Sequence, residues 1–211
     1  MKAKLNVYQA KLNVYQIKAW VYVATGLLFL VISGCGSLLR YSEVAPEAKD
    51  IHPKRIGVLL ADLGTNGEAR GVIDDIITGD LAGRKWFEDV VAADTISRQI
   101  QGNEEHKKAV ADYLAKLKMV NFSDPELSKK IGELAQVDAF IIVNLDYWQY
   151  TMEKTEKIAK VGVSVKMIDV NTGNVLWKAS HHEIETYNWI KPELAKIAKK
   201  LVGIMMDGMP H

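Results

Sequence analysis

The sequence predicts a single domain of mixed α/β (α+β) class, in which helices pack on a mixed sheet of about five strands. Two observations predict the sheet: short, almost continuous apolar runs at 55–62 and 138–143, and apolar alternation from Val161 to Met167. Such runs are typical of parallel strands buried on both faces, whereas alternation is typical of a strand buried on one face. A third observation, apolar residues at helical spacing, predicts the helices. The predicted order is an N-terminal parallel βαβ crossover, further helices, an antiparallel meander and a C-terminal helix.

The crossover is predicted over residues 55–92. The run from Arg55 to Asp62 is the first strand, and Asn66 is the expected N-cap of a helix that carries apolar residues at helical spacing over 69–77. Residues 87–92 form the next predicted strand. A strand, a helix and a strand in this order indicate a right-handed parallel crossover.

Further helices are predicted over 94–101 and 104–118 from their apolar spacing. Ser123-Asp-Pro-Glu126 has the Ser-x-x-Glu spacing of a capping box, which begins another helix. The apolar run from Asp138, which continues through Leu145 and Tyr147, is predicted as a buried strand. Pro192 begins the last helix, because a proline at the first helical position loses no hydrogen bond.

The meander contains the alternating strand over 161–168 and a second strand over 175–185. Between them, Asn171-Thr172-Gly173-Asn174 predicts a tight turn with Gly173 in the left-handed conformation. Asp169 and Asn171 flank this turn, and we expect them to hold its backbone rather than to take part in catalysis.

The N-terminal segment repeats the seven letters AKLNVYQ in tandem at 3–16. Two copies are too few for a coiled coil, which needs about three or four heptads. Four lysines and no acidic residue precede an apolar run over 19–32, which ends at small residues. This layout defines a secretory signal peptide, and the run is shorter than the roughly 20 residues of a membrane-spanning helix. We therefore predict a signal peptide over 1–34, in which the duplication lengthens the positive region.

Ile32-Ser33-Gly34-Cys35 resembles the lipobox of bacterial lipoproteins. The resemblance implies lipid attachment to the Cys35 thiol, cleavage before Cys35 and acylation of the new amino terminus. Cys35 is the only cysteine in the chain, which leaves no disulfide within one chain. Gly36, rather than an aspartate, follows it, which in the bacterial sorting pattern implies the outer membrane. The alternative is an uncleaved N-terminal anchor with an incidental cysteine.

The mature chain is predicted to have a lipidated tether at 35–53 and a folded domain at 54–211. The tether is predicted because residues 36–53 are polar, include two prolines and lack a sustained period. Without the four N-terminal lysines, 23 basic and 26 acidic residues remain, a formal charge of −3. This balance has no basic excess of the kind that nucleic-acid binding requires.

Three stretches of the predicted domain resemble one group of envelope lipoproteins. KWFEDVVAADTISRQIQ (85–101) resembles the second strand and following helix of curli-assembly-type lipoproteins. ELAQVDAFIIVNL (133–145) resembles their helix-to-strand passage, and VSVKMIDVNTGNVLWKAS (163–180) resembles their hairpin. The same fold occurs in lipoprotein activators of peptidoglycan synthases, in the N-terminal domain of TolB and in small neisserial surface lipoproteins. The resemblance covers about residues 55–206 and implies an α/β domain that takes part in envelope assembly.

The sequence also departs from these families. The connection from Leu145 to Val161 is charged and too short for two bilayer crossings of about 9–11 residues each, so we do not expect a pore-forming subunit. The long proline-rich linker of the synthase activators is missing. The size and the short tether fit the small surface lipoproteins best.

One stretch, His181-His182-Glu183-Ile184-Glu185, resembles a metal site. Neighbouring strand residues point to opposite faces, so His181 and His182 are not expected to bind one ion. His181 shares a face with the two glutamates, an arrangement more usual on a solvated strand, and Asp74-Asp75 is expected on a helix surface. A Gly-x-Ser-x-Gly motif and phosphate-loop spacing are absent from the sequence. We predict no catalytic residue, no metal site and no cofactor.

The predicted function is that of an outer-membrane lipoprotein that acts as a non-catalytic structural, assembly or secretion-accessory factor. It would contact the membrane through the lipid on Cys35 and would bind other envelope lipoproteins or copies of itself, but not nucleic acid. The segment Tyr147–Lys160, with Trp148 and Tyr150, is expected to be exposed and to form the contact surface. The alternatives are an activator of a peptidoglycan synthase and, less favoured, a metal-binding envelope protein.

Overall fold

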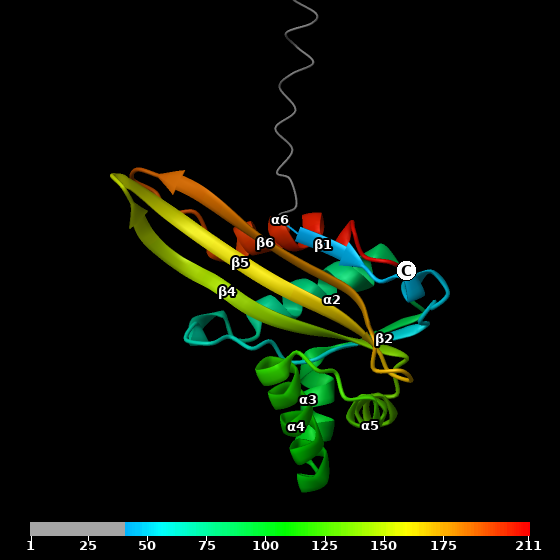
Figure 1. Cartoon of the computed structure of the whole chain (residues 1–211). Helices are drawn as coiled ribbons and strands as arrows, with labels where there is room; N and C mark the ends of the chain where they lie inside the picture. The colour runs from blue at the N-terminus through cyan, green and yellow to red at the C-terminus, as the bar shows by residue number, and fades with distance from the viewer. Residues whose placement is uncertain (1–40) are drawn as a thin grey trace, which may run out of the picture. The chain divides into compact units, whose positions relative to one another are not determined.

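A six-stranded mixed sheet forms the centre of the structure, a computed structural model that describes residues 41–211 (Figure 1). The strand order is β1-β6-β5-β4-β2-β3, and helices pack on both faces of the sheet. The chain from Leu39 to His211 forms one compact unit. The predicted fold class is confirmed, with six strands in place of about five.

The parallel part of the sheet is centred on β2 (Arg55–Val58). This strand pairs in parallel with β3 (Asp89–Val91) on one side and with β4 (Ala139–Glu153) on the other. Helix α2 (Val72–Arg84) connects β2 to β3, as the crossover prediction requires. Asn66 does not cap this helix; it precedes the short 3-10 turn η2 (Gly67–Ala69), and its side chain makes no capping hydrogen bond.

Three helices connect β3 to β4: α3 (Ala93–Gln101), α4 (Glu104–Val120) and α5 (Pro125–Ala135). The N-cap of α5 is Asp124, whose carboxylate accepts hydrogen bonds from the backbone N–H groups of Glu126 and Leu127 at 3.0 and 3.2 Å. Pro125 occupies the first helical position. The N-cap therefore lies one residue after the predicted Ser123, and the predicted capping box does not form, because Leu127 rather than Glu126 then occupies the third helical position.

The antiparallel part of the sheet is a meander of three long strands, β4, β5 (Glu156–Asp169) and β6 (Val175–Tyr187), followed by α6 (Leu194–Met206). The segment Tyr147–Lys160, which the sequence predicts as a charged connection, forms the end of the β4–β5 hairpin. The two strands stay paired as far as Glu153 and Glu156. In Figure 1 this end of the meander extends beyond β2 and β3.

A bulge at Asp146 changes which residues of β4 point into the core. Leu145 is opposite Val163 and Tyr147 is opposite Gly162, so Asp146 is one extra residue on β4. An extra residue reverses the inward and outward alternation beyond it. Trp148 is therefore buried, with 7% of its surface exposed, and Tyr147 is exposed. The prediction that Trp148 belongs to an exposed segment is wrong, because the bulge is not visible in the sequence pattern.

The folded part of the chain begins before the predicted domain boundary at residue 54. Strand β1 (Tyr41–Val44) pairs antiparallel with β6, and a 3-10 turn, η1 (Pro46–Lys49), follows it. The buried indole of Trp177 donates a hydrogen bond to the hydroxyl of Ser42 at 3.0 Å. Residues 41–53 of the predicted tether thus lie within the compact unit. A four-residue edge strand with exposed side chains has no burial pattern that reveals it.

The sheet separates two hydrophobic cores. On one face, α2 and α6 pack on β2, β4, β5 and β6, with residues such as Ile77, Trp177 and Leu201 fully buried. On the other face, α3, α4 and α5 pack around Tyr113, Phe140 and Ile168. The second group of helices covers the β2 end of the sheet. Next to α4, at the edge of the sheet area that these helices cover, lies a cleft.

Candidate functional site

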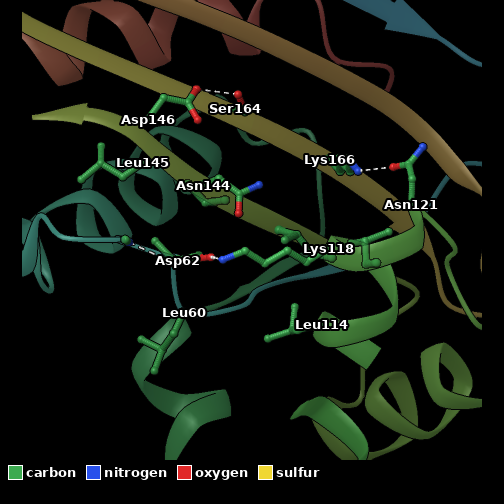
Figure 2. Close-up of a pocket in the computed structure, with 15 residues that line it drawn as sticks. Leu60, Asp62, Leu114, Lys118, Asn121, Asn144, Leu145, Asp146, Ser164 and Lys166 are labelled. Atoms are coloured by element: carbon green, nitrogen blue, oxygen red, sulfur yellow. Dashed lines mark hydrogen bonds and ion pairs between the residues drawn. The ribbon is translucent and has the colours of Figure 1, made fainter. Parts of the chain in front are cut away.

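A cleft with a volume of about 690 Å³ opens between α4, the loop after β2 and the surface of β4 and β5 (Figure 2). Both apolar and polar groups come from the loop after β2, from α4 and its C-terminal end, and from the strands. The residues that line the cleft include Leu60, Asp62, Lys118, Asn121, Asp146, Ser164 and Lys166.

The cleft lies at the carboxyl end of β2, where the chain paths on the two sides of this strand diverge. The connection from β2 to β3 runs through α2 on one face, and the connection from β3 to β4 runs through α3, α4 and α5 on the other. In open α/β sheets, ligands bind in the crevice at such a point, outside the carboxyl ends of the parallel strands. The topology therefore places this cleft where the fold favours a binding site.

A buried carboxyl group fixes the loop that forms one wall of the cleft. Asp74 Oδ1 accepts a hydrogen bond from the backbone N–H of Ala61 at 2.9 Å. Asp74 is buried, and this burial raises the pKa of its carboxyl group. The expectation that Asp74 lies on the surface is wrong, while its neighbour Asp75 is exposed. A helical pair of aspartates does not show in sequence which member faces the sheet.

An ion pair crosses one end of the cleft. Lys118 Nζ of α4 lies 2.8 Å from Asp62 Oδ2, and both side chains are largely exposed. The hydrogen bond from Lys118, together with that from the backbone N–H of Gly64, lowers the pKa of Asp62. The backbone of Asp62 also pairs with β4, since its N–H donates to Val143 and its carbonyl accepts from Leu145. The charges of Asp62 and Lys118 thus neutralise each other.

Lys166 of β5 lines the cleft beside Asn121 (Figure 2). Its Nζ donates a hydrogen bond to Asn121 Oδ1 at 2.8 Å. Asn121 ends α4 with φ 51°, in the left-handed region where asparagine is tolerated. Burial, and then the neighbouring charge of Lys178, lower the pKa of Lys166. An ammonium group with three N–H donors is therefore held inside a cleft by a neutral amide.

The far end of the cleft carries a row of hydroxyl and carboxyl groups on the uncovered sheet face. Ser164 Oγ donates to Asp146 Oδ2 at 2.6 Å and lies 3.1 Å from Ser180 Oγ. The bulge places Asp146 opposite this serine pair, so the irregularity in β4 also supplies a cleft residue. Groups of this kind form hydrogen bonds to polar ligands.

The histidine stretch predicted as a weak metal candidate lies on β6. His181 is buried rather than solvated; its Nε2 lies 3.5 Å from Glu183 Oε1, and Lys200 of α6 lies 3.6 Å from the other oxygen of Glu183. His182 packs its ring against Tyr147. Within residues 41–211, no group of three or more histidine, cysteine, aspartate or glutamate side chains is placed to hold a metal ion.

The turn between β5 and β6 has the predicted form. Gly173 has φ 71°, and a Cβ there would lie 2.8 Å from the Cα of Pro125. Asp169 Oδ2 accepts hydrogen bonds from the backbone N–H and the hydroxyl of Thr172, at 2.8 and 2.6 Å. Asp169 therefore holds the turn, while the Asn171 side chain is exposed at its tip.

The remaining predicted residues are placed differently. Ile32, Ser33, Gly34 and Cys35 lie outside the described residues. Tyr150 is half-exposed, and its hydroxyl donates to the carbonyl of Pro192 at 2.8 Å. This hydrogen bond thus connects Tyr150 to the loop before α6.

The cleft and the most exposed of the large apolar side chains within residues 41–211 were not identified from the sequence. Trp189 and Ile190, in the loop before α6, are 96% and 85% exposed. A signal for the cleft was present in the position of Asp62 at the end of a buried strand and in Lys166 within an otherwise apolar strand. Asp62 and Lys166 do not form a sequence motif, because the segments that line the cleft lie about 100 residues apart in the chain.

Comparison with known proteins gives no family assignment. No protein-family model matches the chain, and no curated protein sequence matches it. Among solved structures, the chain is similar to the PelC dodecamer from Paraburkholderia phytofirmans, with 14% identity over 82% of this chain and 98% of that one, at a TM-score of 0.47. It is also similar to lipoprotein GNA1162 from Neisseria meningitidis, with 15% identity over 70% and 94% of the two chains, at a TM-score of 0.47. Likenesses this distant carry no argument about function. None of the helices between residues 41 and 211 is long and apolar enough to cross a membrane.

Proposed function

We propose that this protein is a lipid-anchored lipoprotein of the bacterial outer membrane that works as a non-catalytic assembly factor through protein–protein contacts. The observation that carries the proposal is the exposed pair Trp189–Ile190, whose side chains are 96% and 85% exposed. Large apolar side chains gathered on a surface mark contact sites, and tryptophan is among the residues that contribute most to binding energy.

The loop that carries this pair is held in place rather than free to fold back. The hydroxyl of Tyr150 is bonded to Pro192, and the ammonium group of Lys191 lies 4.6 Å from the centre of the Tyr150 ring. Tyr187 packs edge-on against the same ring. The pair is therefore presented by a preorganised support, which lowers the entropy lost on binding.

Two strand edges beside this surface have backbone groups open to a partner. Among the described residues, no strand pairs with the outer edge of β4 beyond Leu145, and none pairs with the outer edge of β6 from Glu183 to Tyr187. Open edges can accept an added strand from another chain, which is a common mode of protein recognition. They support contact with a protein, because an added strand can replace water as the hydrogen-bond partner of these groups.

The proposed anchor would keep the domain close to the membrane. If Cys35 carries the lipid, the five residues 36–40 separate it from β1, and such a segment spans at most about 20 Å. A domain held this close meets neighbours anchored in the same bilayer at a high effective concentration. The short reach favours assembly in the membrane plane over activation of a synthase far across the envelope.

The anchor is tested by Cys35→Ala, which should abolish lipid labelling and leave the precursor uncleaved. Mass spectrometry of the membrane-extracted wild-type protein should find Cys35 modified. An unmodified Cys35 in that sample would contradict the anchor.

The contact surface is tested in the lipidated full-length protein by replacing both Trp189 and Ile190 with serine. Crosslinking in intact envelopes should yield about tenfold fewer complexes, because each lost contact residue weakens binding by about 1 kcal/mol or more. The matched control replaces Met119 and Val120, an exposed apolar pair at the end of α4 that is 82% and 68% exposed. Equal loss in both variants, or in neither, would contradict the proposed surface, provided that both keep the wild-type melting temperature.

A further inference from the structure

The positive charge around Lys166 exceeds the negative charge that the fold supplies to it. Lys166 on β5 and Lys178 on β6 are directly opposite each other in the strand register. Like charges in this position repel each other. Lys178 is paired with Glu43 at 3.0 Å, whereas Lys166 donates to the neutral side chain of Asn121. Of these two ammonium groups, that of Lys178 is paired with a carboxylate, whereas that of Lys166 is bonded to an amide.

The nearby carboxylates are committed elsewhere. Asp62 pairs with Lys118, and Asp146 accepts the hydrogen bond from Ser164. Figure 2 shows these pairs on either side of Lys166, with the ammonium group of Lys166 directed at Asn121. A partly buried cation with so little compensation is costly to the fold, and burial together with Lys178 lowers its pKa. An anion from a ligand would remove this cost.

The surroundings of Lys166 define what kind of anion fits. Leu60, Leu114 and Ile142 provide apolar surface in the same cleft, and Asn121, Asn144 and Ser164 provide side chains that can bond to amide groups. We propose that the cleft binds a peptide carboxylate at Lys166, with an apolar side chain of the peptide against Leu60 and Leu114. A carboxylate, an amide chain and an apolar side chain together match the three kinds of group that line the cleft.

This inference deepens the proposed function, because the peptide would belong to a protein partner, but it can be tested without that partner. The probe is fluorescein-Gly-Ser-Leu-Leu with a free C-terminal carboxylate, compared with the same peptide as its C-terminal amide. Fluorescence anisotropy with the purified full-length protein should give at least tenfold tighter binding of the carboxylate form. Equal binding of the two peptides would overturn the inference.

Variants of the lysine assign the preference to its charge. Lys166→Gln should abolish the preference for the carboxylate, and Lys166→Arg should retain it, because the arginine keeps the positive charge. Lys129→Gln is the matched control and should also retain the preference, since Lys129 is exposed on α5 and does not line the cleft. A preference that survives in Lys166→Gln would overturn the assignment of the site.

Competition separates a peptide from a small organic acid. Unlabelled Gly-Ser-Leu-Leu should displace the probe at least tenfold more effectively than hexanoate, which has the carboxylate and the apolar chain but no amides. Equal displacement would overturn the peptide in favour of a small carboxylic acid. Failure of these peptide measurements leaves the crosslinking result for Trp189 and Ile190 unaffected, so the two proposals fail independently.

Discussion

The two ends of the sheet differ in how they are covered, and this difference determines where the cores and the proposed binding surfaces lie. At the β2 end, helices pack on both faces, and the strands are apolar on both sides. Along β5 and β6, α6 covers one face, while the other carries Lys160, Ser164, Lys166 and His182. The covered end builds the cores. The half-covered end supplies the cleft, the open edges and the exposed loop.

The largest expected effect concerns two tryptophans at the half-covered end of the sheet, Trp148 and Trp189. Trp148 lies in the core next to the bulge, and Trp189 is almost fully exposed. Trp148→Ala should lower the free energy of unfolding by about 3–5 kcal/mol, because it removes a large buried side chain and leaves a cavity. Trp189→Ala should change it by less than about 0.5 kcal/mol. Urea denaturation of both variants measures the contrast, and a stable Trp148→Ala variant would show that the bulge does not turn this side chain inward.

A smaller effect is expected at the turn that joins the half-covered strands. Gly173→Val should lower the free energy of unfolding by about 1–3 kcal/mol, since a β-branched residue is strained at φ 71° and its Cβ would press on Pro125. Gly79→Ala in α2 is the control, because a Cβ there meets no atom within 4 Å. It should stabilise the protein by about 0.5–1 kcal/mol through helix propensity. Melting temperatures that change in the same direction in Gly173→Val and Gly79→Ala would contradict the assigned turn conformation.

The sequence predicts the covered end of the sheet better than the half-covered end. The runs at 55–62 and 138–143 are apolar because burial on both faces requires it, so they predict strands directly. The alternation of β5 and the Gly173 turn are likewise visible in the letters. Beyond Leu145, one extra residue reverses every inward position, and periodicity read from the sequence alone then assigns Trp148 to the wrong face.

The cleft depends on information that a linear pattern does not contain. Asp62 and Lys166 lie about 100 residues apart and meet only because β2, β4 and β5 are neighbours in the sheet. Strand β1 is similar: four exposed residues pair with β6 through their backbones, and backbone pairing leaves no apolar pattern. Pairwise tertiary contacts, rather than local propensity, determine both features.

The smallest expected effect concerns the carboxyl group that holds the cleft wall to the covered end. Burial raises the pKa of Asp74 in the folded protein above its unfolded value of about 3.9, so the folded state binds more protons there. The contribution of Asp74 to stability is therefore fully present below the unfolded pKa and is lost as the pH rises through the folded pKa.

Asp74→Asn removes this titration but keeps an oxygen that can accept from Ala61. The stability of the wild type relative to Asp74→Asn should thus decrease as the pH rises from about 4 and then become constant. Urea denaturation of the two proteins at a series of pH values measures this difference. If the wild type and Asp74→Asn keep a constant difference across this range, Asp74 does not titrate as a buried carboxyl group, and the loop is held by other contacts.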